Sequence, residues 1–340
     1  MQQENGGTVL LHEAGIYAVA TGTLAGSLCL IGASEQRGGG CSAVTLDGSA
    51  VHQQIWTDCG GTMKVCADGA GGLFGIQNFI MGTAATDTKV VWCTKKSGGW
   101  ESKTVVEMPC IHNLAVVGRA NERSLVIATL CASRKDGNDW SHPGAVYAAP
   151  ILEEGIGAPR LIVDGITKNH GFLHRTDASG CESVYVSGSE GVFALHVPTT
   201  ASGKWEVEQL LALEVSDLCL CDIDGDGEEE VGVYEGFHGN RFCVYDKTDG
   251  TYQRVFSLPV TFGHPVYGGH GRMYAGSRKG EGELYEIWCE EGQYRVRELA
   301  KEMYASSLCE VNYEGCAGIV AACKNGDVVF FPFNGEVEQR

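Results

Sequence analysis

The sequence has little of what marks membrane, secreted and nucleic-acid-binding proteins. It contains no uninterrupted apolar run of about 18 residues, the length that a membrane-spanning helix needs. Its first residues, MQQENGGTVLLHEAG, lack the basic and apolar segments of a signal peptide. Only 25 Lys and Arg stand against 43 Asp and Glu, and a net charge of −18 disfavours nucleic acid and anionic membranes as partners. We therefore expect a globular protein of the cytoplasm.

The cysteines also lack the regular spacing of a disulfide framework. The 15 cysteines form no CxxC pair and are scattered through strand-like segments such as SLCLIG and LCLCDID. A secreted protein would show an even number at framework spacings. A reduced cysteine behaves as a small buried hydrophobe, which suits an alternating strand. We predict that the thiols are core residues in a reducing compartment.

Helical periodicity is nearly absent. Only KWEVEQLLALEV (204–215) and VRELAKEMY (296–304) could be helices, and both also fit strands. Elsewhere short apolar runs alternate with Gly, Asp and Asn, and 48 glycines against 8 prolines indicate many tight turns. Three segments are typical of hairpins: RFCVYDKTDGTYQRVFSL, GELYEIWCEEGQYRVREL and VVFFPFNGEVEQR. The chain is predicted to be all-β.

The strand-like segments repeat. Seven apolar strands, each ending in small residues, align as second strands of a common unit at 27–34, 78–84, 125–133, 183–189, 230–236, 272–277 and 318–324. Their spacing of roughly 40 to 60 residues is the period of four-stranded propeller blades. We predict a single domain over residues 1–340, a seven-bladed β-propeller of four-stranded blades.

One loop has the spacing of a calcium site. DIDGDGEEE (222–230) provides acidic side chains at loop positions one, three, five and nine, and a backbone carbonyl at Glu228. The four acidic residues are Asp222, Asp224, Asp226 and Glu230. Oxygen ligands on a glycine-relaxed loop suit Ca²⁺. The loop resembles the calcium loop of FG-GAP/VCBS-type propeller repeats, although Glu230 replaces the usual Asp. The resemblance implies a structural ion, and a solvated acidic turn is the alternative.

Three histidines share one repeat position. His112, His170 and His264 each begin the first strand of a unit, in CIHNLAVV, KNHGFLH and FGHPVYGG. First strands line the channel of a propeller, so we expect the three rings to converge at one mouth of it. Three histidines form an open coordination set for Zn²⁺, Mn²⁺ or Fe²⁺. A lone histidine at a strand start is ordinarily a hydrogen-bonded structural residue, so the hypothesis depends on the shared register.

Cationic side chains follow the second strands. The tripeptide SRK occurs twice and provides Arg134, Lys135, Arg278 and Lys279. We predict that both arginines overhang the histidine face and clamp an anion, the alternative being ordinary solvated loops. Candidates for general acid and base are His142, His238 and Tyr267.

These features together resemble propeller enzymes that act on sugars. The resemblance is to the propeller domain of the aldos-2-ulose dehydratase family and to propeller-fold sugar lyases. It implies a metal-assisted lyase, dehydratase or epimerase acting on a small anionic or keto sugar, with a cation stabilising the enolate. The alternative is a non-catalytic propeller that binds carbohydrate or a protein partner. Substrate, choice of metal and oligomeric state are left open.

Overall fold

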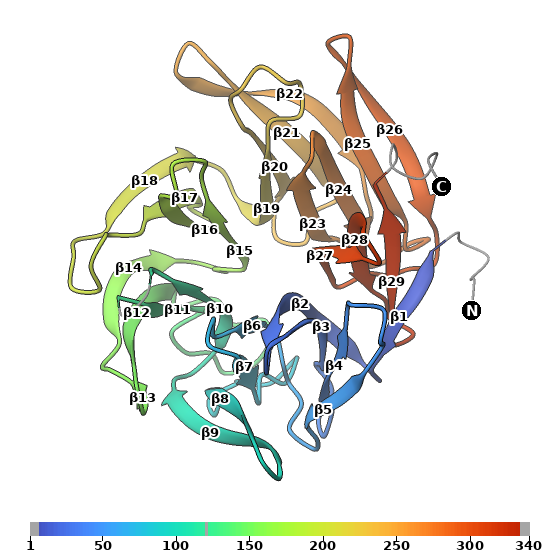
Figure 1. Cartoon of the computed structure of the whole chain (residues 1–340). Coiled ribbons are helices and arrows are strands. Elements are labelled where there is room, and N and C mark those ends of the chain that lie inside the picture. The colour runs from blue at the N-terminus through green and yellow to red at the C-terminus, as the bar shows by residue number, and fades with distance from the viewer. Residues whose placement is uncertain (1–6, 120–121, 334–340) are drawn as a thin grey trace. The chain divides into compact units, whose positions relative to one another are not determined.

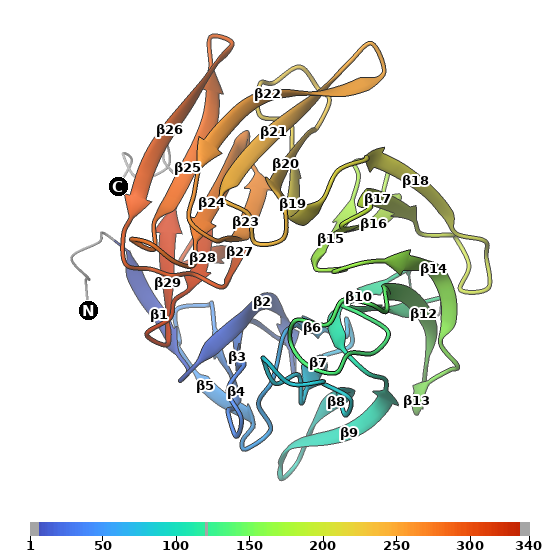
Figure 2. The ribbon, with the colours of Figure 1, turned by 180° about the vertical axis from the view of Figure 1, so that it is seen from behind.

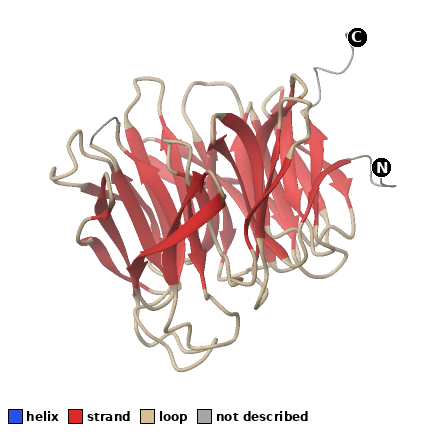
Figure 3. Ribbon diagram, turned by 60° about the horizontal axis from the view of Figure 1, so that its bottom comes forward, coloured by secondary structure: helices blue, strands red, loops and turns tan. Residues whose placement is uncertain are grey.

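The computed structural model describes residues 7–119 and 122–333. Within these ranges every helix or strand element is a strand, and 29 strands form seven sheets (Figure 3). Six sheets have four strands and one has five. The fold is a seven-bladed β-propeller, as predicted. In the described part of the chain, no helix has the length and apolarity needed to cross a membrane.

The chain divides into two compact units, described separately below. Unit 1 comprises Met1–Ile162 and Ser306–Arg340, and unit 2 comprises Val163–Ala305. Unit 1 contains four of the sheets and unit 2 contains three. The prediction of a single domain is not tested by this division and stays a prediction.

Unit 1 begins with three blades that follow one another in sequence. The first consists of β2 (Ile16–Leu24), β3 (Ser27–Ser34), β4 (Cys41–Thr45) and β5 (His52–Trp56). The second consists of β6 (Val65–Ala67), β7 (Leu73–Gln77), β8 (Lys89–Lys96) and β9 (Gly99–Glu107). The third consists of β10 (Ile111–Val117), β11 (Ser124–Thr129), β12 (Gly144–Leu152), β13 (Gly155–Ile156) and β14 (Arg160–Ile166). Consecutive strands pair antiparallel, except that β14 pairs with β12.

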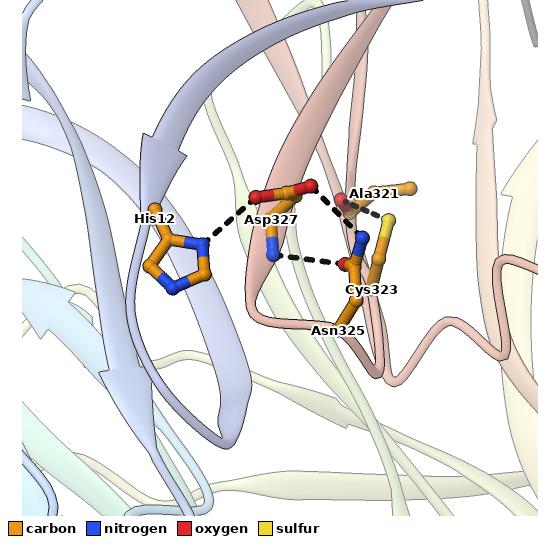
Figure 4. Close-up of polar contacts among 5 residues, drawn as sticks. All are labelled: His12, Ala321, Cys323, Asn325 and Asp327. Atoms are coloured by element: carbon orange, nitrogen blue, oxygen red, sulfur yellow. Dashed lines mark hydrogen bonds and ion pairs between the residues drawn. The ribbon is translucent and has the colours of Figure 1, made fainter. Parts of the chain in front are cut away.

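The fourth blade of unit 1 is built from both ends of the chain. β1 (Thr8–His12) pairs antiparallel with β29 (Asp327–Pro332), which continues to β28 (Cys316–Ala322) and β27 (Ser307–Tyr313). The two end strands lie side by side in Figures 1 and 2. His12 Nδ1 lies 2.8 Å from Asp327 Oδ1, and Asp327 also holds the preceding turn through Asn325 (Figure 4). Polar contacts thus fix the register at this junction.

Unit 2 has three blades of regular meanders. The first consists of β15 (Gly171–Thr176), β16 (Glu182–Gly188), β17 (Gly191–His196) and β18 (Glu206–Leu211). The second consists of β19 (Val215–Cys221), β20 (Glu230–Glu235), β21 (Arg241–Thr248) and β22 (Thr251–Pro259). The third consists of β23 (Gly263–Gly269), β24 (Arg272–Ser277), β25 (Leu284–Glu290) and β26 (Gln293–Ala300). The predicted hairpins β21–β22 and β25–β26 are confirmed.

One sequence prediction misplaced a strand, and part of another lies outside the described residues. Residues 78–84 form a loop rather than a second strand, because β7 ends at Gln77 and Asn78 adopts a left-handed backbone with φ of 69°. The apolar residues Phe79 and Ile80 gave this loop the sequence pattern of a strand. The second strand of the hairpin predicted for 328–340 falls on residues 334–340, which lie outside the described residues. The observed outer partner of β29 is β1.

The cysteines are reduced and mostly internal. All 15 are free thiols, and nine of them are buried. Burial raises the pKa of several of these thiols, for example to about 11 for Cys93 and Cys221. The prediction that cysteine fills the core is confirmed for these nine residues and is wrong for Cys181, which is exposed.

Candidate functional site

The backbone confirms the repeat register of the three histidines. A non-glycine residue with left-handed φ stands two positions before each of them: Cys110 (57°), Lys168 (55°) and Phe262 (58°). His112 and His264 lie at the start of β10 and β23, and His170 directly precedes β15. The same sharp turn therefore delivers each histidine into a first strand.

In unit 2 three histidines gather into one cluster. His170, His238 and His264 each offer a ring nitrogen, and these nitrogens lie within 4.8 Å of one another. Ring centroids are separated by 4.8 Å for His170–His238, 5.3 Å for His170–His264 and 5.1 Å for His238–His264. His170 and His264 are 6% and 4% exposed. We call these three residues the histidine cluster.

Two of the cluster residues, His170 and His238, are held as neutral imidazoles by burial. Burial lowers the pKa of His170 to about 4, although Nδ1 contacts the backbone carbonyl of Ser216 at 3.0 Å. Burial lowers the pKa of His238 further, to about 2, with an added contribution from His170. His238 Nδ1 is buried and has no hydrogen-bond partner in the described part of the chain. Neutral imidazole with an available lone pair is the form that ligates a metal.

Aromatic rings and cations surround His238. Its ring lies 4.3 Å from that of Phe237 and stacks on that of Phe262 at 4.5 Å. Lys279 Nζ lies 4.2 Å from the centre of the Phe262 ring, and Lys168 Nζ lies 5.4 Å from the centre of the Phe237 ring. A lysine therefore lies over each of the two aromatic rings that contact His238.

Arg278 completes this electrostatic setting. Its charge contributes to lowering the pKa of both His170 and His238, so the guanidinium acts on the cluster itself. It follows β24, as the sequence predicted. His238 and Phe262 are both left-handed, with φ of 49° and 58°. Such backbone conformations are costly for bulky residues and tend to concentrate at functional sites.

The other sequence-predicted residues lie in unit 1 or farther along a strand. His112 belongs to unit 1, where its ring contacts the edge of Phe79 at 5.2 Å and its Nδ1 contacts Asn113 at 3.1 Å. Its predicted role as a metal ligand stays a prediction. In the cluster seen here the third member is His238, which the sequence assigned to proton transfer.

Arg134 differs most from expectation. The sequence predicted a surface side chain, but Arg134 is only 7% exposed and its guanidinium carbon lies 5.0 Å from the centre of the Phe79 ring. The residue lies in the loop 132–143, which packs on residues 78–84, and this packing explains the burial. Lys135 and His142 on the same loop are exposed, and the Tyr267 ring lies 6.2 Å from Tyr274 in unit 2. The catalytic roles proposed for these residues stay predictions.

The acidic loop between β19 and β20 forms a second cluster. Asp222, Asp224 and Asp226 each offer a carboxylate oxygen within 4.8 Å of the others. Glu230 is 1% exposed: Oε2 accepts the Ile223 N–H at 2.8 Å, and Oε1 is buried without a partner among the described residues. Burial, assisted by Asp224, raises the pKa of Glu230 to about 7. A bound cation would satisfy these carboxylates, so the residues fit Ca²⁺.

Comparison with known proteins identifies the fold and no family. No family model and no curated protein sequence matches the chain. Similar solved structures include two proteins proposed to be 6-phosphogluconolactonases. The protein from Bacteroides uniformis is 13% identical, with a TM-score of 0.55 and coverage of 94% of this chain and 93% of the other. The protein from Bacteroides fragilis is 11% identical, with a TM-score of 0.55 and coverage of 94% and 91%.

A chain from a structure of the mitotic checkpoint complex shares the fold as well. A chain of the mitotic checkpoint complex is 11% identical, with a TM-score of 0.61 and coverage of 95% and 93%. At these identities the likeness establishes the propeller fold alone, which hosts both enzymes and interaction platforms. Function has to be argued from the clusters.

Proposed function

We propose that the protein is a metal-assisted enzyme that acts on a small anionic sugar derivative at the histidine cluster. The observation that carries this proposal is the meeting of three imidazoles whose nitrogens lie within 4.8 Å of one another. Tetrahedral coordination at about 2.1 Å places two nitrogens about 3.4 Å apart, so a modest closure of the rings accommodates an ion. Zn²⁺, Mn²⁺ and Fe²⁺ all accept imidazole ligands.

The groups around the cluster favour an anionic substrate. Lys279 and Lys168 lie over the aromatic rings that flank His238, and the charge of Arg278 reaches the cluster. Lys168 is already paired with Glu214 at 2.9 Å, so we assign the binding of a substrate carboxylate or phosphate to Arg278 and Lys279. Phe237 and Phe262 are half-buried, and the part of each side chain that stays exposed would pack against the apolar face of a sugar. The lactonase names of two structural neighbours agree with a sugar-derived substrate.

The chemistry follows from polarising an oxygen of the substrate. A divalent ion would supply a Lewis acid, and Arg278 and Lys279 would orient the anionic group. Elimination or epimerisation beside a carbonyl is our first candidate reaction, with water excluded by the aromatic pair. Lactone hydrolysis is the second candidate, favoured by the two neighbours. Ultraviolet absorbance of an unsaturated product and acid release from a lactone distinguish the two.

Metal content tests the proposal. Protein purified without a histidine tag is expected to carry about one transition-metal ion per chain, and His238→Gln or His170→Gln is expected to weaken its affinity at least about tenfold. His196→Gln is a matched control, because His196 is exposed on β17 and contacts Ser183. Plasma mass spectrometry after titration and desalting gives the ratio. Wild-type protein that stays metal-free after incubation with each ion would leave the non-catalytic binding propeller as the better reading.

We propose in addition that the acidic loop binds Ca²⁺ through Asp222, Asp224, Asp226 and Glu230 and that this ion is structural. The unpartnered oxygen of buried Glu230 supports this proposal. The FG-GAP resemblance and a cytoplasmic location also stay predictions. Both predictions are compatible with a propeller fold, but other propeller families have the same fold.

A further inference from the structure

Two cysteines in unit 1 lie at the same end of a strand pair. Cys110 immediately precedes β10 and Cys131 follows β11 by two residues. Ile111 is opposite Thr129, and the Leu130 N–H donates to the Cys110 carbonyl at 2.9 Å. Both side chains belong to one buried cluster, and ionisation of Cys110 raises the pKa of the Cys131 thiol. The ladder therefore brings the two cysteines to the same end of one strand pair.

The thiol pair lies beneath two surface loops. Cys110 and Cys131 are 0% and 1% exposed. One covering loop is 78–88, whose Ala84 carbonyl accepts from Cys110 Sγ at 3.5 Å. The other is 132–143, which touches the first so closely that a Cβ on Gly137 would lie 2.9 Å from Gly82 Cα. Loop cover opens more readily than a strand core, so a small reagent can reach the pair.

A buried cation accompanies the thiols. The charge of Arg134 acts on both sulfurs. Its Nε and Nη2 atoms, the edge that ordinarily grips an anion in parallel, are buried without a hydrogen-bond partner in the described part of the chain. The nearby carboxylate of Asp139 is already engaged by the Lys135 and Ser141 backbone N–H groups. The thiols of Cys110 and Cys131 are therefore the groups beside Arg134 whose ionisation would give the guanidinium an anionic partner.

We propose that Cys110 and Cys131 are a redox-active dithiol that a hydroperoxide converts to a reversible intrachain disulfide. The Cys110 thiolate attacks the outer oxygen of the hydroperoxide; the O–O bond breaks, and sulfenic acid and an alcohol or water form after uptake of one proton. The Cys131 thiol then attacks the sulfenic sulfur, an S–S bond forms and water leaves. Sulfur loses two electrons and the peroxide gains two. Arg134 stabilises the attacking thiolate.

This modification site is independent of the enzyme proposed above. It lies in unit 1 and uses no residue of the histidine cluster. The remaining thiols provide internal comparisons, since Cys93, for example, is equally buried but is hydrogen-bonded to Ser102.

Peptide mapping tests the proposal on the full-length protein. Treatment with a few equivalents of hydrogen peroxide, then alkylation and mass spectrometry, is expected to show a Cys110–Cys131 cross-link that dithiothreitol removes. Cys131→Ser is expected to accumulate sulfenic acid at Cys110, trapped by dimedone, and Cys110→Ser to abolish both products. Arg134→Met is expected to slow cross-linking about tenfold or more, and Arg134→Lys to recover part of that loss.

Arg123→Met is the matched control, since Arg123 is in unit 1 and donates to the Asp68 carbonyl. Circular dichroism verifies that each variant is folded. Cross-links distributed over other cysteines, or a Cys110 no more reactive than Cys93, would overturn the proposal. So would an Arg134→Met protein that oxidises at the wild-type rate. Loss of metal binding in His238→Gln leaves this result unaffected, so the two proposals fail separately.

Discussion

The charge of Arg278 reaches two members of the histidine cluster, His170 and His238. Arg278→Ala is expected to lower turnover by about 10²-fold or more, as loss of one oxyanion donor does, and Arg278→Lys to restore only part because it lacks the planar fork. The assay is a screen of sugar acids, keto-sugars and sugar lactones, followed by kinetics on the active compound. Arg241→Ala is the control, since Arg241 is exposed and pairs with Glu235 at 3.5 Å. Wild-type turnover in Arg278→Ala would remove this residue from the mechanism.

Individual residues show what the sequence could predict. The positions of His170 and His264 followed from repeat register alone, and the structure brings both into one cluster. The sequence could not predict that His238 belongs to the histidine cluster. Its left-handed backbone turns this loop residue back toward the first strands, and that conformation has no signal in the sequence. The two SRK tripeptides look identical in sequence, yet Arg134 is buried on Phe79 and Arg278 is not. That difference depends on a neighbouring loop that contributes Phe79.

At the scale of elements, the β19–β20 loop should respond to calcium. Ca²⁺ is expected to raise the melting temperature, since ligand at about 100 times Kd adds about 2.7 kcal/mol of stability. Asp224→Asn and Glu230→Gln should lose this response. Asp177→Asn should keep it, because Asp177 caps the corresponding β15–β16 turn without two further carboxylates. Differential scanning calorimetry with Ca²⁺ or EGTA measures the shift. Equal melting temperatures in both buffers would mean that the loop is a solvated turn.

The bounds of a strand could be predicted where a turn precedes and follows the apolar segment. The segments 27–34 and 272–277 match β3 and β24 residue for residue. The prediction for segment 78–84 failed because its apolar residues lie in a loop, where Phe79 is 0% exposed. The apolar pattern of this segment therefore reflects the burial of Phe79 and not the pairing of a strand. The pairing of β1 with β29 depends on residues over 300 positions apart and carries no local signal.

At the scale of the whole molecule, reduced cysteine makes the fold sensitive to alkali. Burial raises the pKa of Cys93 and Cys221 to about 11 and of Cys323 to about 12, against 9.0 for a free thiol. Above pH 9 the unfolded chain therefore releases protons that the folded chain retains. Their contribution to stability is complete below pH 9 and falls as pH rises toward 11, by about 1.4 kcal/mol per pH unit for each thiol.

Urea unfolding between pH 7.5 and 10, with a phosphine reductant present, measures this loss. Three such thiols correspond to a slope of about 4 kcal/mol per pH unit near pH 10, a large fraction of the stability of an ordinary domain. Cys323→Ala is expected to reduce the slope by about one thiol, although it also lowers stability at pH 7.5 through lost packing. Cys181→Ser should leave the slope unchanged, because Cys181 is exposed. A flat profile to pH 10 would show that these thiols ionise as easily in the folded chain as in the unfolded one, and the interior would then be far more polar than the packing of its strands indicates.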